Sequence, residues 1–223
     1  MFTDNAPAPQ ESCLVLLSGG LDSAVTLALA KLNSKTLYTL TFNYGQKHDR
    51  EAESAQKLSN HYNTMHFSVY DISLRAFKGL NKSDDVTPMP FGLMPQTWKP
   101  GRNIMFLSYA GAFCVQHSIH MIAVGIHAED QPGYPDCGST FLCVMESVLQ
   151  LGLSHPLSIW APLLNKDKPR IVELGCELGV PFEMTWSCYE GGEKPCMECD
   201  ACARRAAAFA TMAKKDPLLK EEK

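Results

Sequence analysis

The sequence lacks an uninterrupted apolar run of about 18 residues, which is the length that a membrane-spanning helix needs. Its N-terminal residues, MFTDNAPAPQESC, contain neither the basic segment nor the apolar segment of a secretory signal. An excess of basic residues is also missing: the net charge is −4, and the Lys and Arg side chains are scattered apart from Lys214 and Lys215. Proteins that hold nucleic acid on their surface usually have a basic face. We therefore expect a cytoplasmic protein without a membrane partner and without a direct nucleic-acid partner.

Cysteine, by contrast, is abundant, with 9 residues in a chain of 223. Four of them lie between Cys188 and Cys202. An extracellular disulfide scaffold would be shorter and would follow a signal peptide. The cysteines therefore indicate a reduced protein in which clustered thiols bind a metal.

The chain has the length of one domain with a short addition, and it shows no internal repeat and no linker between two large domains. We predict an N-terminal tail over residues 1–11, a main domain over residues 12–185, and a metal-binding segment with a final helix over residues 186–214. Residues 78–100 are rich in proline and glycine and predict a long loop.

Short apolar or β-branched segments alternate with amphipathic ones along the main domain. The expected strands cover residues 13–17, 36–42, 65–69, 119–126 and 157–160. The expected helices cover residues 22–32, 48–62, 102–117, 140–151 and 168–178. This alternation predicts an α/β fold with a doubly wound, mostly parallel sheet, followed by a C-terminal zinc-binding element.

A glycine-rich segment, SGGLDS, lies where the first expected strand meets the first expected helix. Glycines allow a tight turn there, hydroxyl and N–H groups can donate to an anion, and the helix start carries partial positive charge. The aspartate could cap this helix or help to hold Mg²⁺. The expected nucleotide-binding residues are Ser18, Gly19, Gly20, Leu21, Asp22 and Ser23.

This loop is not a Walker A motif, because it lacks the Gly-Lys-Ser/Thr ending that reaches the β- and γ-phosphates. A loop that grips pyrophosphate without that lysine suits cleavage between the α- and β-phosphates of ATP. The alternative is an ordinary glycine-rich turn with a capping aspartate.

The clustered cysteines Cys188, Cys196, Cys199 and Cys202 have the spacing C-x7-C-x2-C-x2-C. Four thiolates on one tetrahedral zinc ion leave no open position, which predicts a structural site. An iron–sulfur cluster, or redox-active or merely buried thiols, are the alternatives. The other cysteines are expected to be small buried residues, with only Cys137 a candidate to face a pocket.

Together these motifs resemble the 7-cyano-7-deazaguanine synthase family of PP-loop ATP pyrophosphatases, whose fingerprint is SGGxDS. The resemblance extends from about residue 13 to residue 209. It rests on SGGLDS at 18–23, FNYGQKH at 42–48, GRN at 101–103, GYPDC at 133–137 and LGVPFEMTWSCYEGGEKPCMECDAC at 178–202.

The resemblance implies an ATP-dependent carbon–nitrogen ligase that uses ATP, Mg²⁺ and Zn²⁺. Family members adenylate 7-carboxy-7-deazaguanine, form its amide with ammonia, and convert the amide to the nitrile, 7-cyano-7-deazaguanine, with a second ATP. The product feeds queuosine or archaeosine synthesis in tRNA. The resemblance also implies a homodimer.

Adenylation brings a carboxylate and a triphosphate together, so cations must offset their repulsion. Arg102, Lys168 and Asp22 are the expected catalytic residues, although a surface role for Lys168 is an alternative. By resemblance, Tyr44, Gly45 and Gln46 would hold the adenosine. Arg102, Asn103, Tyr134 and Asp136 are the expected substrate contacts, with plain packing and turn roles as alternatives for the last two. The side chains of His48, His117, His127 and Trp186 could equally be core or surface groups.

The sequence departs from the family's pattern around the GYPDC segment. Relatives commonly have Ser-Gly before Tyr-Pro-Asp-Cys and Arg-Pro-Glu-Phe after it, whereas this chain has Pro132-Gly133 before it and Gly138, Ser139, Thr140 and Phe141 after it. Three alternatives therefore stay open: a paralogue that stops at the amide or uses another amine, a tRNA-modifying PP-loop enzyme, and a non-enzymatic zinc module.

Overall fold

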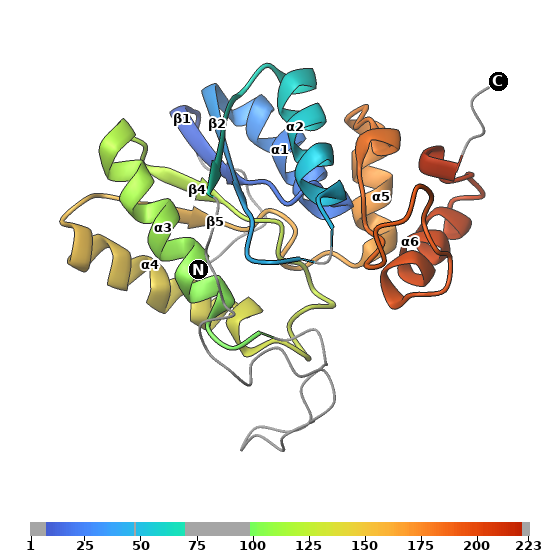
Figure 1. Ribbon diagram of the computed structural model, residues 1–223. Coiled ribbons are helices and arrows are strands. Elements are labelled where there is room, and N and C mark those ends of the chain that lie inside the picture. The colour runs from blue at the N-terminus through green and yellow to red at the C-terminus, as the bar shows by residue number, and fades with distance from the viewer. Residues whose placement is uncertain (1–7, 47, 70–98, 220–223) are drawn as a thin grey trace.

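A computed structural model describes residues 8–46, 48–69 and 99–219 of the chain (Figure 1). Its centre is a five-stranded sheet with the order β3-β2-β1-β4-β5, in which every neighbouring pair is parallel. The strands are β1 (Gln10–Leu16), β2 (Ser34–Phe42), β3 (Met65–Val69), β4 (Met121–Ala123) and β5 (Ser158–Trp160). The predicted parallel α/β sheet is therefore confirmed.

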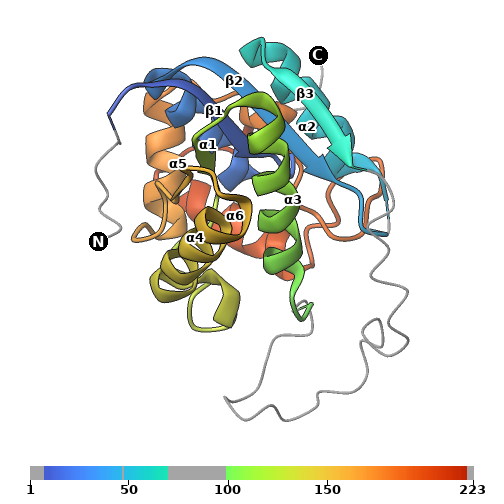
Figure 2. The ribbon, with the colours of Figure 1, turned by 90° about the vertical axis from the view of Figure 1, so that its left-hand side faces the viewer.

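Helices cover both faces of this sheet, as Figures 1 and 2 show. On one face lie α1 (Leu21–Asn33), α2 (Arg50–Tyr62), α5 (Lys168–Glu177) and α6 (Asp200–Thr211). On the other face lie α3 (Arg102–His117) and α4 (Ser139–Leu153).

The central strand β1 shows why the sheet is covered on both sides. Cys13 and Val15 belong to the core beneath α1, whereas Leu14 belongs to the core beneath α3 and α4. All three side chains are 0% exposed, because successive residues of a strand point to opposite faces. An uninterrupted apolar run in the sequence thus becomes a strand buried on both faces.

The strand order creates the place where ligands bind in open α/β sheets. The chain runs from β1 through β2 to β3 at one edge, and then returns past β1 to form β4 and β5 on the other side. The connections that follow β1 and β4 therefore diverge at the carboxyl ends of these two strands, which is the position of the binding crevice in such sheets.

Two element boundaries differ from the expectation. Strand β1 begins at Gln10, which pairs with Ser34 of β2, whereas the tail was predicted to extend to residue 11. Strand β4 covers only Met121–Ala123 of the predicted 119–126, and Gly125, two residues after it, lies against the start of α1. A Cβ atom on Gly125 would be 3.1 Å from the backbone nitrogen of Ser23.

Most of the predicted long loop, residues 78–98, lies outside the described residues, as do Lys47 and residues 1–7 of the tail. Within the described part of the chain, none of the helices has the length and apolar character needed to cross a membrane.

Candidate active site and metal centre

The phosphate loop, residues 18–23, connects β1 to α1 as the sequence predicts. Gly19 has a φ of +86°, and a Cβ atom there would be 2.1 Å from the carbonyl oxygen of Glu51. Both the backbone conformation and this close approach to α2 require glycine. The Ser18 hydroxyl accepts from the Gly20 N–H at 3.2 Å and donates to the Ser23 hydroxyl at 3.1 Å, so the turn is held without any ligand.

The N-cap of α1 is Gly20, and no side chain caps this helix end. The suggested capping role for Asp22 is therefore wrong, because its carboxylate is engaged elsewhere. The N-terminus of α1 instead presents backbone N–H groups and partial positive charge beside the crevice, as an anion-binding site requires.

Asp22 forms an ion pair with Lys168, the first residue of α5. The Lys168 ammonium donates to both carboxylate oxygens, at 2.7 and 2.8 Å, across 146 residues of sequence. The lysine side chain is only 14% exposed, so the alternative of a surface lysine does not hold. The structure thus brings two of the three expected catalytic residues into direct contact.

His127 and Asp130, in the loop after β4, extend this ion pair. The Nε2 atom of His127 lies 3.1 Å from the ammonium of Lys168, and the backbone N–H of His127 donates to Asp130 at 3.2 Å. Burial raises the pKa of the Asp130 carboxyl, and the nearby imidazole of His127 partly counteracts this rise. The cluster is therefore a set of partly desolvated charges, which is typical of functional sites.

A cavity of about 360 Å³ opens beside the phosphate loop at the carboxyl ends of β1, β2 and β4. Its apolar wall includes Phe42 and Phe106, whose rings stack with centroids 4.2 Å apart. Tyr44 and Arg102 line the same cavity, with the guanidinium 5.8 Å from the centre of the tyrosine ring. This cavity combines flat apolar surface with a cation, and its volume lies in the range of small-molecule sites.

A second cavity of about 200 Å³ adjoins the first on the side of α5 and α6. Lys168 and His127 line it, together with Arg204 of α6. The two cavities share lining residues, namely Ser18, Asp22, Glu51, Asp130, Tyr134 and Tyr189. A bound molecule can therefore extend from one cavity into the other past the phosphate loop.

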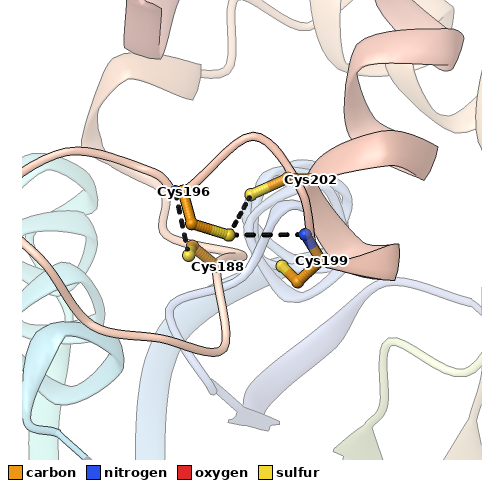
Figure 3. A group of neighbouring side chains, drawn as sticks. All are labelled: Cys188, Cys196, Cys199 and Cys202. Atoms are coloured by element: carbon orange, nitrogen blue, oxygen red, sulfur yellow. Dashed lines mark hydrogen bonds between the residues drawn. The ribbon is translucent and has the colours of Figure 1, made fainter.

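The four clustered cysteines come together as predicted (Figure 3). Their sulfur atoms all lie within 4.8 Å of one another, and those of Cys196 and Cys202 are 4.0 Å apart. Four thiolates bound to one zinc ion at about 2.3 Å stand about 3.8 Å from each other. A [4Fe–4S] cluster places each cysteine on a different iron atom and separates the sulfurs further. The donor set and its spacing therefore fit a single tetrahedral ion.

Backbone N–H groups reinforce this metal centre. Those of Glu190 and Cys196 donate to the Cys188 sulfur, at 3.4 and 3.3 Å, and that of Cys199 donates to the Cys196 sulfur at 3.3 Å. Such donors stabilise thiolates around a metal ion. The group could thus hold a metal.

The cysteine segment is attached to the phosphate loop through Trp186. The backbone N–H of Trp186, two residues before Cys188, donates to the carbonyl of Gly19 at 2.9 Å. The indole N–H donates to the Cys188 carbonyl, also at 2.9 Å. One buried tryptophan therefore contacts both the loop and the metal centre.

Comparison with known proteins decides the family. The family described as "Queuosine biosynthesis protein QueC" matches residues 12–213. The chain belongs to the QueC family. Relatives named 7-cyano-7-deazaguanine synthase include that of Trichodesmium erythraeum, which is 37% identical over 92% of this chain and 99% of the relative. Another, from Trichormus variabilis, is 38% identical over 92% of this chain and 96% of the relative.

Solved structures with the same fold are more distant from this QueC-family chain. The NMN synthetase of Francisella tularensis superposes with a TM-score of 0.52 at 17% identity, over 93% of this chain and 79% of that one. The U34-tRNA thiolase NcsA of Methanococcus maripaludis, solved with its [4Fe-4S] cluster, gives a TM-score of 0.51 at 18% identity, over 92% of this chain and 66% of that one. These two likenesses support the fold.

Most of the predicted site residues of this QueC protein line the cavities. Those on the walls are Ser18, Gly20, Leu21, Asp22, Ser23, Tyr44, Gln46, Arg102, Asn103, Tyr134 and Lys168. The cysteine that was expected to face a pocket, Cys137, also lines the larger cavity.

Among the predicted nucleotide and substrate contacts, three do not line either cavity, namely Gly19, Gly45 and Asp136. The Asp136 carboxylate accepts the backbone N–H of Asn103 at 3.3 Å, at the start of α3. The Asn103 amide in turn donates to the Asp136 carbonyl at 3.0 Å. This exchange holds the GYPDC turn against α3, and the substrate contact of Asp136 stays a prediction, as does that of Tyr134 on the cavity wall.

The sequence reasoning missed Glu51, Asp130 and Tyr189, each of which lines both cavities. Burial raises the pKa of the Glu51 carboxyl, while His48 and Arg102 act in the opposite direction. In the sequence, Glu51 reads as one of several acidic residues in the first turn of a helix. The signal that could have revealed it is its place directly after the FNYGQKH segment.

Proposed function

We propose that this protein is a 7-cyano-7-deazaguanine synthase, an ATP-dependent carbon–nitrogen ligase that converts 7-carboxy-7-deazaguanine and ammonia into the nitrile. The observation that carries the proposal is the pair of adjoining cavities that meet at the Asp22–Lys168 ion pair and the start of α1. One cavity has aromatic walls for a purine-like ring, and the other has cations for phosphates.

The reaction that this site would support begins with adenylation. A carboxylate oxygen of the acid attacks the α-phosphorus of ATP, and pyrophosphate leaves with the electrons of the broken P–O bond. Ammonia then attacks the carbonyl carbon, AMP leaves with the electrons of the broken C–O bond, and the nitrogen loses one proton to give the amide. In the second round the amide oxygen attacks the α-phosphorus of another ATP and pyrophosphate leaves. The C–O bond then breaks, AMP departs, and the nitrogen loses its two protons to give the nitrile.

The residues present fit the charges in these steps. Lys168 and the N-terminus of α1 would bind the departing pyrophosphate, and Arg102 would offset the repulsion between the carboxylate and the triphosphate. Phe42, Phe106 and Tyr44 would exclude water from the ring of a bound purine or deazapurine.

Mg²⁺ bound to the triphosphate would neutralise part of its charge. Asp22 is the carboxylate of the phosphate loop that fits this ion, since the Asp130 carboxylate on the same cavities already accepts the backbone N–H of His127. Both oxygens of Asp22 now accept from Lys168, so holding the ion requires the lysine to turn toward the phosphates.

We propose zinc for the metal centre of Cys188, Cys196, Cys199 and Cys202, with a structural role. The sulfur spacing supports a single ion, and four thiolates leave no coordination position for a substrate. All 9 cysteines are unpaired, which supports a reducing, cytoplasmic location.

The residues after the GYPDC turn depart from the family's pattern. This departure was the reason for the alternative in which the enzyme stops at the amide or uses another amine. Gly138 is the N-cap of α4, and Ser139 and Thr140 are exposed. None of these three residues lines either cavity, so the walls that the described residues form do not include the altered positions. The nitrile-forming reaction therefore stays the leading proposal, and the amide-stopping enzyme stays the alternative.

Homodimer formation stays a prediction from the resemblance. Helix α4 carries exposed apolar side chains at Val144, Val148 and Leu151, which follow one another along one side of the helix. Sedimentation equilibrium of the purified protein would give the oligomeric state.

The test of the proposed function is product analysis by mass spectrometry with ATP, Mg²⁺, ammonia and 7-carboxy-7-deazaguanine. We expect the nitrile together with AMP and pyrophosphate, and a matched Asp22→Ala sample without product. Accumulation of the amide would support the paralogue that stops there. An absence of AMP with the metal-loaded protein would contradict an ATP-using enzyme and favour a zinc module.

A further inference from the structure

One side chain in the smaller cavity, His127, has a role that the reaction scheme does not assign. It follows β4 by four residues and lies 4% exposed between the phosphate loop and the start of α5. Its Nε2 atom lies 3.1 Å from the Nζ atom of Lys168 and 3.9 Å from the Asp22 carboxylate.

The contact with Lys168 determines which imidazole nitrogen accepts. A lysine ammonium has three N–H donors and no acceptor. Two of its donors go to the two oxygens of Asp22, at 2.7 and 2.8 Å, and the third points to His127 Nε2. With Lys168 charged, Nε2 is the acceptor in this contact, and the proton of a neutral imidazole then lies on Nδ1.

The environment of the Nδ1 atom indicates that this arrangement does not serve the stability of the fold. It is buried and has no hydrogen-bond partner among the described residues of the chain. A buried polar group without a partner destabilises a fold. An apolar side chain of similar size would avoid this cost, so packing does not explain why a histidine occupies the position.

We propose that His127 is a positioning residue, whose neutral imidazole keeps the Lys168 ammonium directed into the phosphate-binding cavity without cancelling its charge. The inference rests on the proposed ATP-dependent function.

A histidine suits this position because its neutral imidazole can accept a hydrogen bond from Lys168 without adding a negative charge. A carboxylate holds an ammonium strongly, but it also neutralises the charge that the ammonium would offer to a phosphate. When Lys168 turns from Asp22 toward bound ATP, it loses its two carboxylate contacts. The remaining contact is to a nitrogen that carries no charge in this arrangement, so the contact itself does not neutralise the ammonium.

Asp130 keeps the imidazole in place. Its carboxylate accepts the backbone N–H of His127 at 3.2 Å and lies 3.4 Å from Nε2. It thereby fixes the loop after β4, from which His127 reaches the lysine. The imidazole accordingly needs no movement when the lysine changes its partner.

The test compares His127→Leu with His127→Gln in full-length, metal-loaded protein. Glutamine can place an uncharged oxygen acceptor close to the position of Nε2, whereas leucine cannot accept. Binding of ATP with Mg²⁺, and no acid substrate, would be measured by isothermal titration calorimetry. The affinity should fall roughly tenfold in the leucine variant and stay within about threefold of wild type in the glutamine variant, as expected for loss or retention of a charge-assisted hydrogen bond.

Two further measurements distinguish positioning from a structural role. The melting temperature of the leucine variant should equal or exceed that of wild type, because the unpartnered Nδ1–H is removed. In a Lys168→Met background, the leucine substitution should add almost nothing to the loss of affinity, because the two residues act through one contact. The matched control His61→Leu, on the exposed surface of α2, should bind ATP like wild type.

Equal affinities of wild type and the leucine variant would overturn the proposal, as would a glutamine variant as weak as the leucine variant. Additive effects of the His127 and Lys168 substitutions would overturn it as well. A wild-type protein that binds no ATP would instead contradict the proposed function, and this outcome is separate from the other three.

Discussion

The phosphate loop and the cysteine segment are two regions that the chain organises in different ways. The loop is held by its own backbone and hydroxyl groups and by one close approach of Gly19 to Glu51. The cysteine segment, residues 188–202, contains no strand and has no regular structure before α6 begins at Asp200. The first region is held by its own hydrogen bonds, whereas the second brings four thiols within 4.8 Å of one another, where we propose that a zinc ion stabilises them. Substitutions in the cysteine segment should therefore lower stability, whereas substitutions in the phosphate loop should lower activity.

The largest effect is expected from Cys199→Ser. A structural zinc site contributes about 10–16 kcal/mol, comparable with the total stability of about 5–15 kcal/mol of a domain. We expect loss of bound metal, a markedly lower melting temperature and no turnover, measured by elemental analysis, calorimetry and AMP release. The control Cys143→Ser changes an exposed cysteine on α4 and should keep metal and activity. A soluble, active Cys199→Ser protein would contradict the structural role of the metal.

Asp22→Ala should instead abolish chemistry and leave the fold intact. The substitution removes the carboxylate that pairs with Lys168, and we expect turnover to fall roughly 10²–10³-fold. Pyrophosphate release measures the rate, and elemental analysis should find the metal content unchanged. Glu11→Ala breaks the exposed Glu11–Lys35 pair and is the matched control, with no expected effect. Metal loss in Asp22→Ala would show that the metal centre depends on the phosphate loop.

Gly19→Ala would test whether the backbone alone shapes the loop. The added Cβ would meet the Glu51 carbonyl oxygen at 2.1 Å in a backbone conformation that alanine rarely adopts. We expect ATP affinity to fall at least tenfold by calorimetry. Gly138→Ala, where a Cβ meets nothing within 4 Å among the described residues, should bind ATP normally. Normal ATP binding by Gly19→Ala would mean that the loop can move away from α2.

The smallest effect is expected from Gly138→Arg, which introduces the arginine that the family resemblance leads us to expect at this position. The position has a φ of −89° and open space around it, so the fold should tolerate the side chain. An added cation near the GYPDC turn should lower KM for the acid substrate by roughly threefold and leave KM for ATP unchanged. Steady-state kinetics with each substrate would measure the two values. An unchanged KM for the acid would place its carboxylate away from this turn.

The sequence predicted the phosphate loop and the four cysteines because each is a contiguous motif whose spacing determines its geometry. Buried β1 was recognisable for a similar reason, since its apolar run is uninterrupted. Glu51, Asp130 and Tyr189 could not be found in this way, because they lie in three separate segments that meet only in the folded sheet.

Asp136 shows the opposite limit of sequence reasoning. Its place in the GYPDC segment suggested a substrate contact, but the carboxylate lies at the start of α3 and accepts from Asn103. An aspartate in a turn serves a nearby helix end as readily as a ligand, and the sequence does not record which helix is near.

The N–H···O bond from Trp186 to Gly19 connects the two regions that the substitutions separate. Thermodynamic reciprocity then applies: if a bound ion stabilises the loop conformation that binds ATP, bound ATP must raise the affinity for the ion by the same free energy. The fraction of working enzyme would accordingly follow the supply of metal in the cell, and abundant nucleotide would protect the enzyme during a metal shortage. A single backbone hydrogen bond between two segments would thus make the fraction of active enzyme depend on the concentration of available metal.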